Sequence, residues 1–188
     1  MVLYTVILLV LVALIVALFA IALYIVSLVP YFALSPPFVP SNKRLSSLIA
    51  EMLDPIPGSV MYELGAGDMR VSLACWRREP AARYIGIEKH FFPRFLAKLH
   101  IRRASAGGQV TVREDDLFTT DLRDATHVYC YLFPAPMQRL LNKFEQELAP
   151  GTIVVSLDFP MRDKGPERTI DLAPYNLRLG KTLYVYRF

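Results

Sequence analysis

The sequence predicts one α/β domain built on a parallel sheet, preceded by an apolar helix long enough to cross a membrane. Short β-rich runs alternate with helical patterns over most of the chain, and a glycine turn follows the first run. The first 42 of the 188 residues carry no charged side chain, so all 21 basic and 17 acidic residues lie in residues 43–188. That remainder is long enough to bury a core of its own.

The apolar segment is predicted to be a membrane anchor over residues 1–30. Residues 2–29 are almost entirely Val, Leu, Ile, Ala and Phe, and about 20 such residues suffice to span a bilayer. Tyr4 and Tyr24 are separated by about 30 Å on a helix, which suits one ring at each membrane interface. No Lys or Arg precedes the segment and no clear cleavage site follows it, so an uncleaved anchor is favoured over a signal peptide.

A proline-rich connector is predicted over residues 31–42, because the prolines of SPPFVPS cannot continue a helix. Lys43 and Arg44 are the first cations after the apolar segment, and none precedes it. The positive-inside rule therefore places residues 43–188 on the cytoplasmic side. We expect a single-pass protein of the cell (inner) membrane, with the mitochondrial inner membrane as the alternative.

Residues 43–188 are predicted to form the domain. Strands are expected at residues 59–64, 84–88, 109–114, 127–132, 152–158 and 182–186, with a weaker one near 169–172. Helices are expected at residues 69–77, 92–105 and 136–148, and Ser41 or Asn42 is expected to cap an earlier helix that ends near Leu53. This alternation indicates a parallel sheet with helices on both faces. The last two strands have no helix between them and are expected to form an antiparallel hairpin at one edge.

The glycine turn, in the sequence ELGAGDMR, lies where open α/β sheets bind their ligands. Gly65 and Gly67, with Ala66 between them, permit a sharp turn and let a ligand approach the backbone. A dinucleotide would require a third glycine, and Arg70 stands at that position. A nucleotide-dependent oxidoreductase is therefore disfavoured.

Two carboxylates, Glu63 and Asp68, flank this turn. They would repel a pyrophosphate but attract the sulfonium and ammonium groups of S-adenosylmethionine. Glu88, at the end of the second expected strand, is placed to accept hydrogen bonds from both ribose hydroxyls. After the third strand, Asp115 or Asp116 could accept from the adenine amino group, with Leu117 against the ring.

Together these elements resemble the class I, seven-strand S-adenosylmethionine-dependent methyltransferases over about residues 41–188. The layout of anchor, PPFVPS connector and ELGAGDMR turn is similar to the membrane-anchored protein-lysine methyltransferases. That family includes enzymes acting on adenine nucleotide translocase and on the ATP synthase c-subunit. Its turn reads D-x-G-x-G-D-G-R, in which this chain has Glu63 for the first Asp and Met69 for the third Gly.

The resemblance implies a Rossmann-like methyltransferase sheet, S-adenosylmethionine as cofactor and a membrane-associated protein substrate. It also places the segment YLFPAPM at the catalytic loop after strand four, with Tyr131, Phe133 and Pro134 as candidate catalytic residues. An aromatic-walled, dehydrated slot suits methyl transfer to an amine. Asp158, ending strand five, could orient the substrate or act as a general base. The alternatives are that the tyrosines only cover the sheet and that Asp158 only caps a strand.

The sequence therefore predicts a membrane-anchored methyltransferase acting on a lysine of a membrane or membrane-proximal protein. The alternatives are a lipid or quinone-like acceptor, or a non-catalytic membrane-tethered module. No nucleic-acid partner is expected, because the N-P-P-Y or D-P-P-Y signature is missing, and no metal, because no Cys/His cluster occurs. Arg94, Lys98 and Arg102 recur on one helical face, as a solvated stripe or as a contact with anionic lipid.

Overall fold

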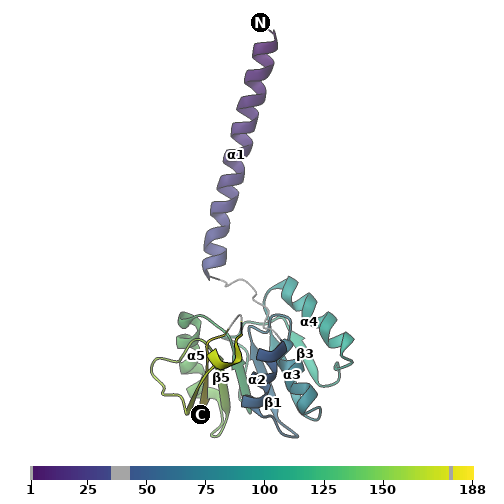
Figure 1. Cartoon of the computed structure of the whole chain (residues 1–188), viewed down its shortest axis with the longest axis vertical. Coiled ribbons are helices and arrows are strands. Elements are labelled where there is room, and N and C mark those ends of the chain that lie inside the picture. Colours follow the sequence, from purple (N-terminus) through teal and green to yellow (C-terminus); the bar gives the residue numbers. More distant parts are fainter. Residues whose placement is uncertain (1, 35–42, 178–179) are drawn as a thin grey trace. The chain divides into compact units, whose positions relative to one another are not determined.

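The structure, a computed structural model, describes residues 2–34, 43–177 and 180–188. The chain divides into two compact units, Met1–Pro37 and Phe38–Phe188. The first contains helix α1 (Val2–Leu34; Figure 1). Within the described residues, the 21-residue span Tyr4–Tyr24 is long and apolar enough to cross a membrane, as judged by length and composition alone. The predicted connector overlaps the end of α1, and the expected cap at Ser41 or Asn42 lies outside the described residues.

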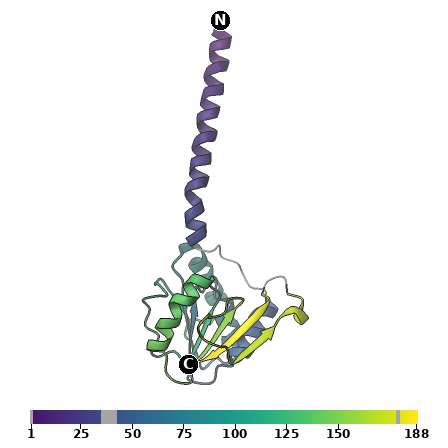
Figure 2. The ribbon, with the colours of Figure 1, turned by 90° about the vertical axis from the view of Figure 1, so that its left-hand side faces the viewer.

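The second unit contains the predicted sheet, with seven strands in the order β3-β2-β1-β4-β5-β7-β6. The strands are β1 (Val60–Leu64), β2 (Arg83–Ile87), β3 (Val110–Arg113), β4 (His127–Cys130), β5 (Ile153–Leu157), β6 (Arg168–Asp171) and β7 (Thr182–Arg187). The pairs among β1 to β5 are parallel, whereas β7 is antiparallel to both β5 and β6. The expected C-terminal hairpin therefore forms one edge, coloured yellow in Figure 2.

Helices cover both faces of the sheet, as predicted. One hydrophobic cluster joins α2 (Lys43–Leu53), α3 (Arg70–Arg78) and α4 (Phe91–Arg103) to the sheet. A second cluster joins the opposite face to α5 (Pro134–Glu147). Alternation along the strands separates the two clusters: Tyr129 belongs to the first, and its neighbours Val128 and Cys130 belong to the second.

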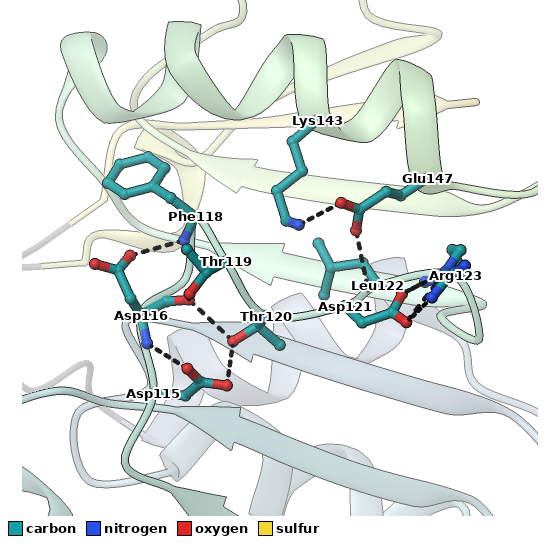
Figure 3. Close-up of polar contacts among 10 residues, drawn as sticks. All are labelled: Asp115, Asp116, Phe118, Thr119, Thr120, Asp121, Leu122, Arg123, Lys143 and Glu147. Carbon is teal, nitrogen blue, oxygen red and sulfur yellow. Dashed lines mark hydrogen bonds and ion pairs between the residues drawn. The ribbon is translucent and has the colours of Figure 1, made fainter.

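The connection between β3 and β4, residues 114–126, contains no helix or strand. It runs over the α5 face of the sheet, where Leu122 and Ala125 join the second hydrophobic cluster. Glu147 of α5 holds this connection by accepting a hydrogen bond from the Leu122 N–H at 2.9 Å. Lys143 pairs with the same carboxylate, as Figure 3 shows. The loop thus takes the place that a crossover helix usually fills between parallel strands.

Candidate active site

The glycine turn lies at the carboxyl end of β1, between β1 and α3. The N–H groups of Gly65 and Ala66 both donate to the carbonyl oxygen of Ile87 at 3.0 Å, so the turn is fixed to the end of β2. Gly65 has φ of 71° and Gly67 has φ of 53°, the left-handed region that glycine adopts without steric cost. Gly65 is exposed while the residues on either side of it are buried, so a ligand can reach the backbone here.

Met69, the departure from the family pattern, is the N-cap of α3 and has φ of 64°. This backbone conformation explains why a glycine is usual at the position. The Met69 side chain is fully buried over Gly86 of β2, where an added Cβ would lie 1.9 Å from the Met69 sulfur. Because Gly86 has no side chain, the Met69 side chain can pack against it.

Glu63 is buried and directed toward α3, because it alternates with Tyr62 and Leu64, which face the other cluster. Its Oε2 accepts hydrogen bonds from the Ser72 N–H at 2.9 Å and the Ser72 hydroxyl at 2.6 Å. Burial raises the pKa of Glu63 to about 7, against the opposing effect of the Ser72 hydrogen bonds. The nearby carboxylates of Asp68 and Glu88 raise it further. The folded protein therefore carries this group only partly ionised at neutral pH.

Asp68 is also buried but has a cationic partner, Arg70. Its Oδ2 lies 2.6 Å from Nε of Arg70, two residues along the chain. The imidazole of His100 from α4 approaches the same residue, with Nδ1 at 3.1 Å from the Asp68 carbonyl oxygen and 3.6 Å from Oδ2. The negative charge that the sequence places beside the turn is thus partly neutralised within the protein.

Glu88 connects the end of β2 to the glycine turn. Its Oε2 accepts from the Gly67 N–H and its Oε1 from the His90 N–H, each at 2.9 Å. Both oxygens keep a further lone pair, so the carboxylate can still accept from two hydroxyl groups. A carboxylate held in this way by backbone donors is pre-oriented for a ribose.

Arg94 of α4 contacts the backbone at the end of β2. This corrects the prediction that it belongs to an exposed cationic stripe. Its guanidinium donates to the carbonyl oxygens of Glu88 and Lys89 at 3.3 and 3.1 Å, and it pairs with Glu114. The residue is 8% exposed. Helical spacing identified the face of the helix but not that Arg94 points inward, toward the carbonyl groups after β2.

The two aspartates after β3 fold their own loop (Figure 3). Asp115 accepts from the Asp116 N–H at 2.8 Å and from the Thr120 hydroxyl at 2.9 Å, using both of its oxygens. Asp116 accepts from the Phe118 N–H at 2.9 Å through Oδ1, and its Oδ2 lies 3.7 Å from Nζ of Lys89. Lys89 directly follows Glu88, so Asp116 is the aspartate whose side chain pairs next to Glu88.

The apolar residues of this loop find partners within the domain. Leu117 is half-buried against the α5-face cluster, and the Phe118 ring lies under the guanidinium of Arg139 at 3.8 Å. A polar cavity of about 460 Å³ opens nearby, beside Tyr62, Arg113 and Asp124. Of the predicted site residues, Asp115 alone lines it.

An aromatic cluster stands beyond the ends of β4 and β5. Tyr131 stacks on Phe159 with ring centroids 6.0 Å apart, and Phe133 meets the edge of Phe159 at 5.5 Å. Pro134 is the first residue of α5. Sequence reasoning missed Phe159, although it directly follows the candidate Asp158. Burial raises the pKa of Tyr131, and the charge of Asp158 and a hydrogen bond with it add to this, so the phenol stays protonated.

Asp158 serves as a strand cap in this structure, one of the two roles expected for it. Its Oδ1 accepts from the N–H groups of Lys181 at 2.6 Å and Thr182 at 3.1 Å, which fixes β5 to the start of β7. Its φ of 62° is unusual for an aspartate and turns the chain immediately after β5. Because the carboxylate also lies beside Tyr131, the cap and the aromatic cluster form one structure.

The strand order, the antiparallel β7 and a glycine turn facing a β2 carboxylate define a class I methyltransferase. Residues 63–168 match the ANTKMT methyltransferase domain family, and the chain belongs to that family. The matched segment contains every candidate site residue, from Glu63 to Asp158. The resemblance and the fold class predicted from the sequence are confirmed, and with them the expected cofactor, S-adenosylmethionine.

Two curated proteins and one solved structure are similar to this chain. A protein-lysine N-methyltransferase of Saccharolobus islandicus is 27% identical over 150 residues, which are 80% of this chain and 92% of that protein. The adenine nucleotide translocase lysine N-methyltransferase of Mus musculus is 36% identical over 131 residues, 68% of this chain and 55% of that protein. The crystal structure of an RNA methyltransferase from Salinibacter ruber with S-adenosyl-L-homocysteine superposes with a TM-score of 0.72 at 35% identity, covering 79% of this chain and 93% of that one.

Proposed function

We propose that this protein transfers a methyl group from S-adenosylmethionine to a lysine side chain of a protein in or near a membrane. The observation that carries the proposal is the family match over residues 63–168, which spans the whole candidate site. Two relatives whose names specify protein lysine support the acceptor. The apolar span Tyr4–Tyr24 supports the membrane location, with the domain on the cytoplasmic side.

The turn and its acids fit the cofactor. When bound, S-adenosylmethionine supplies an electrophilic methyl group on a positively charged sulfur. The exposed backbone at Gly65 lets the ligand approach, and Glu88 would hold the ribose through its remaining lone pairs. Asp116 would accept from the adenine amino group. Glu63 and Asp68 would face the methionine end, where an added cation favours the ionised form of Glu63.

The aromatic cluster would hold the acceptor. The rings of Tyr131, Phe133 and Phe159 can contact the aliphatic stem of a lysine and exclude water from its amine. An amine attacks only when neutral, so its proton must leave first. Asp158 is the carboxylate beside this cluster that can accept the proton, whereas Tyr131, with its raised pKa, cannot act as a base.

Methyl transfer from tritiated S-adenosylmethionine to membranes of a strain lacking the protein tests the proposal. The full chain should label the protein fraction, and hydrolysis should release methyl-lysine. A Glu88→Ala variant serves as the matched control, because it removes the ribose-binding carboxylate. Label that appears in lipid, or no label above the control, would contradict a lysine acceptor.

RNA is the second candidate acceptor, since the Salinibacter ruber relative is named an RNA methyltransferase. The same experiment separates the two when the reaction mixture includes total RNA. Label that is sensitive to ribonuclease and resistant to protease would favour RNA. The reverse pattern would favour protein.

A further inference from the structure

Helix α4 presents three largely exposed phenyl rings. Phe91, Phe92 and Phe95 are 74%, 64% and 54% exposed, and the Phe91 and Phe95 rings stack on each other at 6.4 Å. Contiguous exposed rings of this kind normally mark an interaction surface. Removing these phenyl rings from water is favourable, so whatever binds this surface should contact the rings with apolar groups.

Cations continue the same helical face. Lys98 and Arg102 follow Phe91 and Phe95 at spacings of three, four and seven residues, which places all four side chains on one side of the helix. Both cations are exposed, and the sequence of α4 contains no Asp or Glu. Lys89, whose side chain is 74% exposed and pairs with Asp116, lies just before the rings in the sequence. The α4 surface, defined here as Phe91, Phe92, Phe95, Lys98 and Arg102, is therefore apolar and cationic.

We propose that the α4 surface docks on the anionic face of a lipid bilayer, with the phenyl rings at the level of the headgroups. This inference rests on the membrane location in the proposed function. Phenyl rings with neighbouring Lys and Arg and no acid match an anionic lipid surface, on which amphipathic helices lie with their apolar side buried. A bilayer that holds α1 also keeps the domain at a high local concentration near its surface, so weak docking suffices.

Docking would orient the candidate active site toward the membrane. Helix α4 begins three residues after Glu88, and in a parallel sheet the helix after a strand starts at the carboxyl edge, where the site lies. Lys89 joins this helix to the site through its pair with Asp116. The start of α4, which bears the phenyl rings, therefore lies at the same edge of the sheet as the candidate site, which suits an acceptor lysine at the depth of the lipid headgroups.

Fluorescence quenching by brominated lipid tests the proposal on the full chain in nanodiscs that contain anionic phosphatidylglycerol. F95W in a W76F background places a single indole in the α4 surface, and I56W in the same background is the matched control. Ile56 is 65% exposed but precedes β1, at the opposite edge of the sheet. Brominated lipid should quench the indole at position 95 at least about twofold, since docked helices insert ~5–10 Å, and should leave position 56 unchanged.

A charge-reversed form, K98E with R102E in the F95W chain, should lose this quenching. Equal quenching at positions 95 and 56 would overturn the proposal. The proposal would also fail if brominated lipid did not quench the indole at position 95 and only an added membrane protein shielded it. That result would favour a protein partner. Retention of the full chain on the nanodiscs tests anchoring by α1 separately, so failure of docking and failure of the proposed membrane location give different results.

Discussion

The turn after β1 and the loop after β3 both carry acids into the candidate site, yet these acids do different work. Around the turn, Glu63 of β1 accepts from Ser72 nine residues away, and Glu88, which follows β2, accepts from Gly67 at a separation of 21. In the loop, Asp115 accepts only from residues one and five positions further on. Glu63 and Glu88 therefore fix separate elements to one another. The bonds of Asp115 stay within the loop, whereas Asp116 also pairs with Lys89, which follows β2.

Burial follows the same division. Glu63 and Glu88 are 4% and 7% exposed, whereas Asp115 is exposed and Asp116 half-exposed. A buried acid without its partner costs far more than an exposed one, because its surroundings cannot be rehydrated. Four variants test this contrast, beginning with the one from which we expect the largest effect.

Glu88→Ala should produce the largest loss. It leaves the Gly67 and His90 N–H groups without their acceptor, which should lower the free energy of unfolding by about 2 kcal/mol. It should also weaken S-adenosylhomocysteine binding by about 100-fold, the equivalent of two charge-assisted hydrogen bonds. Calorimetric titration and thermal unfolding measure the two effects. Asp121→Ala, which removes an exposed acid paired with Arg123, is the control and should change neither. An affinity of Glu88→Ala for S-adenosylhomocysteine within threefold of the parental value would contradict the proposal that Glu88 binds the ribose.

Glu63→Gln should change stability in a pH-dependent way. The pKa of this carboxyl rises from 4.5 to about 7 on folding, so the folded chain binds its proton more tightly than the unfolded chain. The stability due to Glu63 is therefore fully present below pH 4.5, declines as pH rises and is lost above about pH 7. Gln cannot ionise, so the variant should unfold at parental free energy near pH 4.5 but be more stable at pH 8, by up to ~3 kcal/mol.

Cofactor binding should move in the opposite direction. A cationic ligand favours ionised Glu63, so the parental affinity for S-adenosylmethionine should increase between pH 6 and about pH 8. The variant should show a flat profile and weaker binding at pH 8. Denaturant titrations and calorimetry at four pH values measure both curves. Parallel stability curves for the two proteins would show that Glu63 does not carry this proton.

Gly86→Ala tests the packing beneath the turn. Its new Cβ would meet the Met69 sulfur at 1.9 Å and the Ala66 Cβ at 2.8 Å. The end of the Met69 side chain can move but Ala66 cannot, so we expect a loss of about 2 kcal/mol, within the usual range for overpacking. Adding Met69→Gly removes the thioether and should recover part of that loss. A double-mutant cycle by denaturant unfolding measures the coupling, and strictly additive effects would argue against contact between these two side chains.

The sequence predicted the elements well because hydrophobic periodicity and turn residues are local signals. The glycine turn with Glu63, Gly65 and Gly67, the seven strands and the terminal hairpin all follow from such signals. Side-chain partners do not, because they depend on which residues the folded chain brings together. The pairing of Asp68 with Arg70 and the burial of Glu63, which raises its pKa, leave less negative charge at the turn than the sequence implied.

The same limit explains two further differences. Arg94 has the spacing of an exposed cation, but the carbonyl groups at the end of β2 draw it inward. Phe159 lacks any motif and becomes a candidate only because β5 ends beside β4, where it meets Tyr131 and Phe133. Both features arise from contacts between separate elements, and hydrophobic periodicity does not predict such contacts.

The aspartates after β3 should give the smallest effects, and these separate the two residues. Asp115→Ala should loosen the loop by about 1 kcal/mol or less, because it loses exposed hydrogen bonds, and leave ligand affinity within threefold. Asp116→Ala should weaken S-adenosylhomocysteine binding by about fivefold to tenfold, the value of one such bond. The inosine analogue, which presents a carbonyl oxygen where adenine has its amino group, sharpens the test. The parent and Asp115→Ala should prefer the adenine ligand, since a carboxylate repels that oxygen, whereas Asp116→Ala should bind both ligands equally. If Asp115→Ala abolishes the preference instead, Asp115 makes the adenine contact. Because both of its oxygens accept hydrogen bonds within the loop in this structure, the loop would then have to rearrange on binding.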